Sequence, residues 1–416
     1  MRLLSLFSGI GAFEKALENL GEPFDLVNYC EIDKYASKAF TLIHHVDESM
    51  NLKDVYSVKP NELPKDIDLI TYGFPCQDIS ISGKQRGFFD GEGLTRSGLF
   101  FKAYDIIKQA KPKIAIAENV KALTSKKFAQ EFKIVLDCLK YAGYKNYYAV
   151  LNSENYGIPQ NRERVFIISI RDDIDHGFMF PKKQELKLRL FDMLEKNVDE
   201  KYFVSKKTLD CILATGTKSF YYKPEIDLEI ARPLTATMHK SHRASQDNYV
   251  SESFVNYGKK MEISDCLLVK EATSKGFKEA HDGDYVNIQF PKSKTRRERI
   301  GKQIANTLLC SDANGVVTKD LRIRKLTPKE CFRLMGFDDK DCDILIENGI
   351  SNTQLYKMAG NSIVVNVLEN IFKSLFAQYS ELFSSNIKIE KSQQLDSWDV
   401  RSDWESRQIT IFDILN

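Results

Sequence analysis

The sequence predicts an α/β fold with a doubly wound, mostly parallel sheet and a second, smaller and less regular domain. Up to Arg171, short runs of β-branched and apolar residues alternate with longer amphipathic stretches, as expected for parallel strands joined by helices. Polar turns directly follow several of the strand-like runs. The carboxyl ends of strands are where open α/β sheets bind ligands, so these turns are the candidate sites.

Each expected element follows from its run of residues. Strands are expected at 3–7, 26–30, 69–73, 114–117, 147–151 and 165–170, and helices at 13–20, 98–110 and 128–141. Thr327 and Glu330 predict a capping box, with Pro328 in the first turn of the helix that it begins. A last helix is expected to start near Asn361 and to continue to Ala377.

Length and composition indicate a soluble, cytoplasmic protein. The 416 residues, 43% of them apolar, suffice for two or three domains. No run approaches the roughly 18 apolar residues of a membrane span, and nothing marks the chain for export. The eight cysteines are scattered without disulfide or metal-ligand spacing, which favours a reducing compartment and no bound metal.

Charge is distributed unevenly along the chain. Residues 177–330 contain 29 Lys and Arg against 21 Asp and Glu, a net charge of +8, whereas the remainder contains 31 against 37, a net charge of −6. A basic insert within an acidic frame is expected where one part of a protein faces phosphates. A solvated charged surface would give the same asymmetry.

A glycine turn after the first strand suggests a nucleoside cofactor. In Phe7-Ser8-Gly9-Ile10-Gly11 the glycines allow close approach of backbone to ligand. Glu31, at the end of the second strand, is placed to accept hydrogen bonds from ribose hydroxyls. The third glycine of the dinucleotide fingerprint is replaced by Glu14, an acid that would repel a pyrophosphate. These residues favour S-adenosyl-L-methionine over NAD.

Three motifs at successive strand ends suggest covalent chemistry on a nitrogen heterocycle. Cys76 follows the third strand in Phe74-Pro75-Cys76-Gln77, where a thiol can act as a nucleophile. Glu118-Asn119-Val120 follows the fourth strand, and Gln160-Asn161-Arg162-Glu163-Arg164 follows the fifth. Separately, such residues are more often a buried thiol, a helix cap and surface charges. Their convergence favours a catalytic site.

Six motifs in order resemble the DNA (cytosine-5)-methyltransferases of bacteria and phages, over residues 4–171 and 322–367. They are the Phe-x-Gly-x-Gly turn, Gly-Phe-Pro-Cys-Gln, Glu-Asn-Val, Gln-x-Arg-x-Arg, Arg-x-Leu-Thr-Pro-x-Glu and Gly-Asn-Ser. The resemblance implies that Cys76 adds to carbon 6 of cytosine, so that carbon 5 becomes able to take a methyl group. It implies that Glu118 holds ring nitrogen 3, and that Arg162 and Arg164 hold the carbonyl oxygen of the base and support the Cys76 loop.

The resemblance also implies a cofactor pocket and a DNA-binding region. Contacts to S-adenosylmethionine are expected from Phe7, Gly9, Gly11, Glu31, Ile32, Pro75, Asn361 and Ser362, and either Asn51 or Asp54 is expected at the adenine. A flipped-out cytosine requires a loop that fills its place in duplex DNA, for which Ser82 and Gln85 are candidates. Phosphate contacts are expected from Arg232, Lys240, Arg243, Arg296 and Arg297.

The expected organisation is a catalytic and cofactor-binding domain at 1–176, a target-recognition domain at 177–330, a return to the catalytic domain at 331–380, and a tail at 381–416. Both Arg232 to Thr237 and Ala305 to Leu308 resemble the Thr-Leu signature of the recognition region. We expect a monomer that acts on double-stranded DNA, with or without a cognate restriction endonuclease. A tRNA cytosine-5 methyltransferase is the alternative that shares the catalytic residues.

Overall fold

The chain divides into two compact units. The computed structural model describes residues 1–383 except positions 77, 80–85, 91–92, 214–215, 218–219, 222, 241, 259, 261–266, 271, 275, 281–284, 288–299, 302–313 and 317–321. The first unit contains Met1–Glu195, Glu229–His242 and the chain from Leu326 onward, and the second contains Lys196–Leu228 and Arg243–Lys325. Ser82, Gln85, Arg296, Arg297, the Ala305 to Leu308 segment and the tail from position 384 lie outside the described residues.

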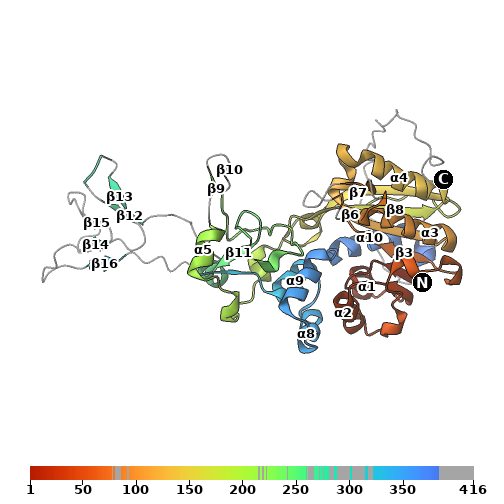
Figure 1. The fold of residues 1–416 in the computed structure, drawn as a ribbon, viewed down its shortest axis with the longest axis horizontal. Helices are drawn as coiled ribbons and strands as arrows, with labels where there is room; N and C mark the ends of the chain where they lie inside the picture. The colour runs from red at the N-terminus through yellow and green to blue at the C-terminus, as the bar shows by residue number, and fades with distance from the viewer. Residues whose placement is uncertain are drawn as a thin grey trace. The chain divides into compact units, whose positions relative to one another are not determined.

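A six-stranded mixed sheet forms the centre of the first unit (Figure 1). Its strands, in spatial order, are β2 (Asp25–Cys30), β1 (Arg2–Leu6), β3 (Leu69–Tyr72), β6 (Ile114–Val120), β8 (Glu163–Arg171) and β7 (Tyr144–Asn152). The first four are parallel, whereas β8 is antiparallel to both of its neighbours. The amino end of β8 therefore lies beside the carboxyl ends of β6 and β7.

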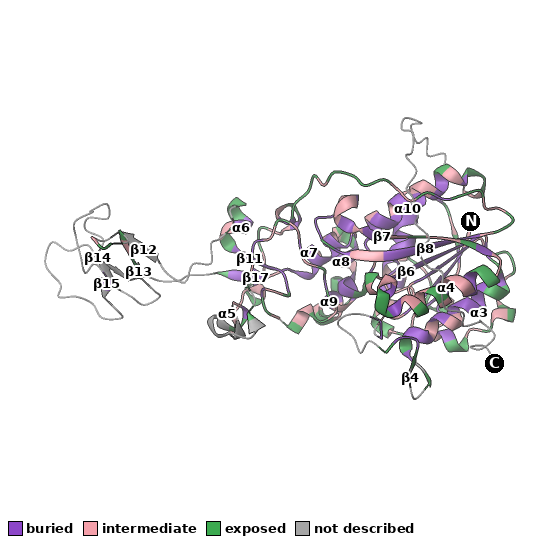
Figure 2. Ribbon diagram, turned by 90° about the horizontal axis from the view of Figure 1, so that it is seen from above, coloured by how far each residue is buried: buried purple, intermediate pink, exposed green. Residues whose placement is uncertain are grey.

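Helices cover both faces of the sheet because its strands are apolar on both faces. On one face, α3 (Phe100–Ala110) and α4 (Ala129–Tyr141) pack on a core that includes Leu6, Tyr72 and Ile167. On the other face lie α1 (Ala12–Asn19) and α10 (Val365–Gln378), which contact each other through Phe13 and Phe372. Figure 2 shows the buried residues concentrated in the sheet and on the helix faces against it. The predicted α/β fold class is confirmed.

The remaining helices of the first unit are α2 (Lys34–His44), α7 (Pro328–Leu334), α8 (Asp339–Glu347) and α9 (Asn352–Asn361). The predicted capping box begins α7: Glu330 N donates to Thr327 Oγ1 at 3.2 Å, and Thr327 N donates to Glu330 Oε2 at 2.7 Å. The expectation that the last helix starts near Asn361 is wrong. Asn361 ends α9, and α10 starts at Val365 after an extended turn at Ser362.

The second unit consists of short elements. These are the helices α5 (Lys206–Ile212) and α6 (Glu252–Tyr257), and the strands β9 (Gly216–Thr217), β10 (Phe220–Tyr221), β11 (Tyr249–Ser251), β12 (Leu267–Lys270), β13 (Phe277–Ala280), β14 (Tyr285–Asn287), β15 (Ile300–Gly301), β16 (Asn314–Val316) and β17 (Ile323–Lys325). Its small core is built from Ile212, Tyr249 and Ile323 with their neighbours.

The boundaries of the two units differ from those expected at 177 and 330. Residues 177–195 stay in the first unit because Met179 N donates to Gln378 Oε1 and Gln184 Nε2 donates to Asn370 Oδ1, both on α10. Residues 229–242 return to it through Ala231, whose backbone pairs with Pro159 and Asn161. Arg232 and Lys240, expected in the inserted region, thus belong to the first unit.

No helix in the described part of the chain is long and apolar enough to cross a membrane.

Candidate active site

Cys76 lies just beyond the carboxyl end of β3, at the centre of the parallel part of the sheet. The preceding Phe74 is buried among aromatic rings, and its carbonyl accepts a hydrogen bond from Asn119 Nδ2 at 3.0 Å. The carbonyl of Cys76 in turn accepts from Ile79 N at 3.0 Å. The thiol is half-buried. Asn119, at the end of β6, therefore fixes the loop that carries Cys76.

Hydrogen bonds anchor the described residues of the loop that follows Cys76. Asp78 is buried, its N–H donates to Ser97 Oγ at 3.1 Å, and Arg86 donates to its Oδ1 through Nε and Nη2 at 3.1 and 3.0 Å. The carbonyl of Gly87 accepts from Thr95 Oγ1 at 2.6 Å. These contacts hold both ends of the segment that starts after Cys76.

Glu118 and Arg164 form an ion pair beside Cys76. Glu118 lies on β6 and Arg164 at the start of the antiparallel β8, and the register of these strands places Arg164 opposite Val120. Arg164 Nε is 3.0 Å from Glu118 Oε1, and the two side chains are 20% and 13% exposed. A shielded carboxyl and a cation thus lie next to the thiol.

The pKa values of this group are shifted toward the neutral thiol and the neutral acid. Burial raises the pKa of the Glu118 carboxyl, and the charges of Arg164 and Arg162 offset this only in part. Burial, and then the charge of Glu118, raise the pKa of the Cys76 thiol, while Arg164 and Arg162 lower it. Protonation of Glu118 would therefore make thiolate formation at Cys76 easier.

Arg162 has a different role from Arg164, although only Glu163 separates them. Its side chain is buried, with Nη1 donating to the carbonyl of Leu234 at 2.9 Å, and Nη2 to those of Gly360 and Ser362 at 3.0 and 2.7 Å. Burial, reinforced by the charge of Arg164, lowers the pKa of this guanidinium to about 9. Arg162 therefore cross-links three segments of the first unit.

Gln160 makes a second cross-link that we did not single out from the sequence. Its Nε2 donates to the carbonyl of Leu334 at 2.7 Å, and its Oε1 accepts from Leu234 N at 3.0 Å. Next to Leu234, the backbone at Thr235 lies so close to Gly360 that a Cβ there would be 2.2 Å from the Thr235 carbonyl carbon. The segment that contains Arg232 is therefore built into the first unit, and the Gln-x-Arg-x-Arg motif was the signal in the sequence that could have identified Gln160.

The glycine turn lies at the end of β1, next to the Cys76 loop because β1 pairs with β3. Gly9 and Gly11 adopt left-handed backbone angles, with φ of 58° and 79°, and Phe7 does so at 54°. Gly9 N donates to Glu31 Oε2 at 2.9 Å, and Asp33 N donates to Glu31 Oε1 at 2.7 Å. Ile32 is 73% exposed beside them. Each carboxylate oxygen of Glu31 can still accept a further hydrogen bond.

Asn51 and Asp54 differ in what their side chains already bind. Asn51 Oδ1 accepts from the N–H groups of Glu31 and Lys53, and its Nδ2 donates to the carbonyl of Glu31 and to Ser37 Oγ. Its donors and acceptors are thus used within the protein. Asp54 Oδ1 accepts from Tyr56 N, which leaves acceptor capacity on its carboxylate. Asp54 is the better candidate for the adenine.

The other predicted cofactor residues lie at two separate turns, after α9 and after β3. Asn361 is exposed and Ser362 is buried at the end of α9, and Pro75 is half-buried before Cys76. Glu14 is buried, and burial raises the pKa of its carboxyl. Among the described residues, no group of His, Cys, Asp and Glu side chains could hold a metal ion.

Among the positions expected to contact DNA, the described ones differ in exposure. Lys240 and Arg243 are exposed, whereas Arg232 is partly buried.

Known proteins share both the sequence and the fold. The profile of the C-5 cytosine-specific DNA methylase family matches residues 1–377. An orphan methyltransferase of Bacillus phage SPR is 32% identical over 91% of this chain and 98% of its own, and a type II methyltransferase of Lactococcus lactis subsp. cremoris is 34% identical over 86% and 81%. The crystal structure of the S. pombe Dnmt2 methyltransferase, 18% identical, aligns over 91% of this chain and 99% of its own with a TM-score of 0.58.

The profile covers nine-tenths of the chain, and the phage and bacterial relatives align over 98% and 81% of their own lengths. These matches confirm the family and the enzyme class, DNA (cytosine-5-)-methyltransferase, that the six motifs predicted. The chain belongs to the C-5 cytosine-specific DNA methylase family.

Proposed function

We propose that this enzyme transfers a methyl group from S-adenosylmethionine to carbon 5 of a flipped-out cytosine, at specific sequences in double-stranded DNA, through a covalent bond to Cys76. The observation that carries the proposal is the convergence of three groups at one edge of the sheet. The half-buried thiol of Cys76 follows β3, and the Glu118–Arg164 ion pair, 3.0 Å long, lies at the ends of β6 and β8.

The raised pKa values suggest how attack and protonation are coupled. A protonated Glu118 can donate a hydrogen bond to ring nitrogen 3 of cytosine, which offsets the negative charge that develops when sulfur bonds to carbon 6. The same protonation removes the carboxylate charge that raises the pKa of Cys76. The thiol then loses its proton to solvent, its sulfur bonds to carbon 6, and the electron density displaced onto carbon 5 can take a methyl group. Loss of the proton on carbon 5 then expels the Cys76 thiolate.

The two arginines of the Gln-x-Arg-x-Arg motif would have different roles, one in binding the base and one in positioning the backbone around the site. Arg164, one-fifth exposed and paired with Glu118, would hold the carbonyl oxygen of the base. Arg162 gives its guanidinium N–H groups to three backbone carbonyls. It acts as a positioning residue that fixes Leu234 and Ser362 around the site.

The residues at the ends of β1 and β2 fit the nucleoside of S-adenosylmethionine, which supplies a methyl group on a positively charged sulfur. Glu31, bonded to the N–H of Gly9, can accept further hydrogen bonds from ribose hydroxyls. Asp54 can accept a hydrogen bond from the exocyclic amine of adenine. The exposed Ile32 offers an apolar surface for the adenine ring. Asn361 and Ser362 would border the same pocket from the end of α9.

Contacts to DNA are proposed for both units. Lys240 and Arg243 are exposed cations, suited to phosphate contacts that fix register without reading sequence. Arg232 is only partly exposed, so its contribution to phosphate binding should be smaller. Ser82, Gln85, Arg296 and Arg297 stay predictions, because they lie outside the described residues. The proposed form of the enzyme is a cytoplasmic monomer.

The proposal is tested by methyl transfer from labelled S-adenosylmethionine to unmethylated genomic DNA, with digestion of the product to nucleosides. The wild type should produce 5-methyldeoxycytidine. Cys76→Ser should bind DNA and cofactor but give no product, whereas Cys211→Ser, which changes an exposed cysteine of the second unit, should retain activity. Methylation by Cys76→Ser at a rate near that of the wild type would contradict the covalent mechanism.

The same assay with tRNA as the substrate separates the two nucleic acids. Preferred methylation of tRNA over duplex DNA would overturn the proposed substrate while leaving the chemistry intact. Bisulfite sequencing of the modified DNA then tests sequence specificity, because methylation scattered over cytosines without a shared sequence would contradict it.

A further inference from the structure

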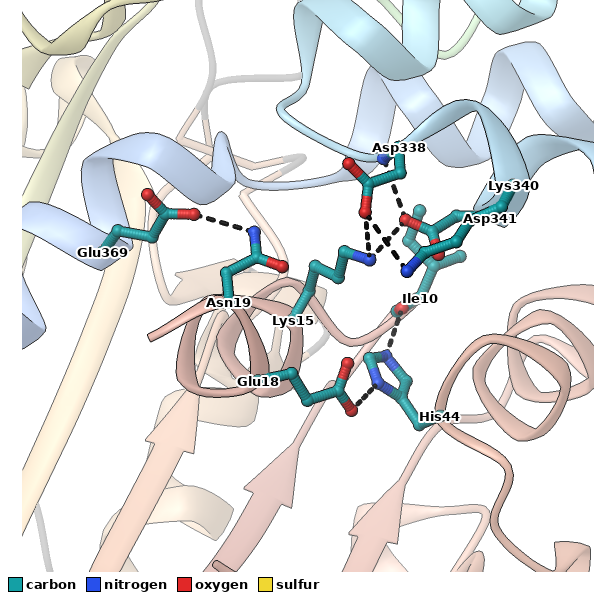
Figure 3. Close-up of polar contacts among 9 residues, drawn as sticks. All are labelled: Ile10, Lys15, Glu18, Asn19, His44, Asp338, Lys340, Asp341 and Glu369. Atoms are coloured by element: carbon teal, nitrogen blue, oxygen red, sulfur yellow. Dashed lines mark hydrogen bonds and ion pairs between the residues drawn. The ribbon is translucent and has the colours of Figure 1, made fainter. Parts of the chain in front are cut away.

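Helix α1, which directly follows the glycine turn, is held by polar contacts to three other helices (Figure 3). Lys15 Nζ is 2.9 Å from Asp338 Oδ2 and 2.7 Å from Asp341 Oδ2, at the start of α8. Asn19 Nδ2 donates to Glu369 Oε1 on α10 at 2.8 Å. The third contact is to His44, the last residue of α2. Of these partners of α1, His44 is the one whose side chain also contacts the glycine turn, at Ile10.

His44 connects α1, α2 and the glycine turn through both of its ring nitrogens. Nε2 is 3.1 Å from the carbonyl oxygen of Ile10, and Nδ1 is 2.7 Å from Glu18 Oε1. The imidazole is 2% exposed. It lies directly against Gly11, where a Cβ would be 2.0 Å from His44 Nε2. The turn and the ring are thus complementary in shape, and this contact requires glycine at position 11.

The two hydrogen bonds of His44 require two protons on the His44–Glu18 pair. A neutral histidine and a carboxylate together hold only one. The carbonyl of Ile10 can only accept, so Nε2 must carry a proton. A second proton must lie between Nδ1 and Glu18 Oε1 to make their 2.7 Å contact a hydrogen bond. Without it, a ring lone pair faces a carboxylate. The bond to Glu18 therefore exists only while the pair holds both protons.

We propose that His44 is a positioning residue for cofactor binding, which fixes the Phe7 to Gly11 turn through the Ile10 carbonyl while the His44–Glu18 pair is protonated. This inference rests on the proposed function, because it assumes that the turn binds S-adenosylmethionine. Loss of the proton releases His44 from Glu18 and loosens its bond to Ile10. Cofactor affinity then decreases as the pH rises.

The charges around His44 determine the direction of the effect. Burial alone lowers its pKa, but the hydrogen bond and charge of Glu18, and then the charge of Glu14, outweigh burial and raise the pKa. Both acids belong to α1, and Glu14 is itself buried with a raised pKa. With a raised pKa, the contribution of His44 is complete below the ordinary imidazole value of about 6.5 and is lost as the pH rises through the folded value.

Two variants separate the two contacts. In His44→Gln, the side-chain amide nitrogen occupies nearly the place of Nε2, so it can donate to Ile10 without titrating. In His44→Asn, the shorter amide can reach Glu18 but not Ile10. Asn19→Ala removes another contact of α1, to Glu369, and serves as the control for general loosening of the helix.

The experiment is calorimetric titration of each protein with S-adenosylhomocysteine between about pH 6 and about pH 9, where histidine titrates. Wild type and Asn19→Ala should lose about threefold to tenfold in affinity over this range, the effect of one hydrogen bond. His44→Gln should show only the titration of the ligand. His44→Asn should bind about threefold to tenfold more weakly than wild type at the acidic end.

Equal pH dependence in wild type and His44→Gln would overturn the inference, as would undiminished affinity of His44→Asn at acidic pH. Failure of the wild type to bind the ligand at any pH would instead overturn the proposed cofactor. In the protein without ligand, the melting temperature of wild type should fall relative to that of His44→Gln as the pH rises. That comparison tests the His44–Glu18 pair independently of the cofactor.

Discussion

The two halves of the proposed active site, a proposed cofactor edge and a proposed nucleophile edge, differ in how many hydrogen bonds within the protein already hold their polar groups. At the cofactor edge, formed by the ends of β1 and β2, Asn51 uses its side-chain donors and acceptors within the protein, and Glu31 holds two backbone N–H groups. At the nucleophile edge, formed by the ends of β3, β6 and β8, Cys76 and Glu118 both have raised pKa values. Burial raises the pKa of Glu31 as well, so the two edges differ in how many hydrogen bonds hold their polar groups and not in the direction of their pKa shifts.

The difference also appears within one motif. Arg162 is buried and bound to three carbonyls, whereas Arg164, two residues later, pairs with a carboxyl that can change its charge. Spacing alone makes them equivalent. Their different surroundings favour a structural role for Arg162 and a catalytic role for Arg164.

The largest effect is expected from Glu118→Gln, which keeps the shape of the side chain but removes its proton exchange. The rate of methyl transfer in a single turnover should fall about 100- to 10,000-fold, the usual contribution of general acid catalysis. DNA and cofactor affinities should change little. A rate within a few-fold of the wild type would show that Glu118 has a structural role and does not act as a general acid.

The same variant should change how stability depends on pH. Because burial raises the pKa of Glu118, the buried acid is favourable below its ordinary value of about 4.3 and becomes unfavourable as the pH rises through the folded value. Glu118→Gln should therefore lose less stability than wild type between acidic and neutral pH. Chemical denaturation at a series of pH values measures this, and an identical slope in both proteins would contradict it.

Replacing each arginine by methionine sharpens the contrast between them. Arg162→Met should lower the free energy of unfolding by about 2–4 kcal/mol, because three carbonyls lose a charged donor. Arg164→Met should cost about 1 kcal/mol or less, because Glu118 can protonate when its partner is removed, yet it should slow methyl transfer, though less than Glu118→Gln does. Denaturant titration and single-turnover kinetics distinguish the two, and a reversed order of stability would refute the assignment.

At the cofactor edge, Asn51→Ala and Asp54→Ala should distinguish a residue that stabilises the fold from one that binds the cofactor. Asn51→Ala should cost about 1–3 kcal/mol of stability, because the groups that it bound are left unpaired. Asp54→Ala should weaken S-adenosylmethionine binding about tenfold, as expected for a charged hydrogen bond, with a smaller change in stability. If Asn51→Ala weakens binding without loss of stability, Asn51 is the adenine contact instead.

The smallest effect is expected from Ile32→Ala. The side chain is 73% exposed, so its removal should leave the melting temperature unchanged. Cofactor affinity should fall about threefold, as expected for apolar surface that only the ligand covers. An unchanged affinity would show that the adenine does not lie on Ile32.

Local patterns in the sequence predicted the frame of the catalytic unit well. The apolar run before Cys76 is long enough to define β3, and the loop after a buried parallel strand must open at the ligand-binding edge. Glu118 and Arg164 were predicted from motifs, and the antiparallel β8 then brought them to 3.0 Å. The Thr327 capping box formed because its atoms are only three residues apart.

Features that depend on distant contacts could not be predicted. Ser362 directly follows α9, and its carbonyl is held by Arg162, 200 residues away, so the helix break before Val365 leaves no local signal. The choice between Asn51 and Asp54 depends on the N–H of Glu31, which is close only after folding. His44 meets Ile10 across 34 residues, and its neighbours in sequence do not indicate the contact.

The proposed bond between the sulfur of Cys76 and cytosine can be trapped. Duplex DNA containing 5-fluorocytosine, incubated with the enzyme and S-adenosylmethionine, should give a complex that survives denaturation, because fluorine cannot leave carbon 5 as a proton does. Mass spectrometry of the digested complex should find the nucleotide on the peptide that carries Cys76. No adduct, or an adduct on another residue, would contradict the account.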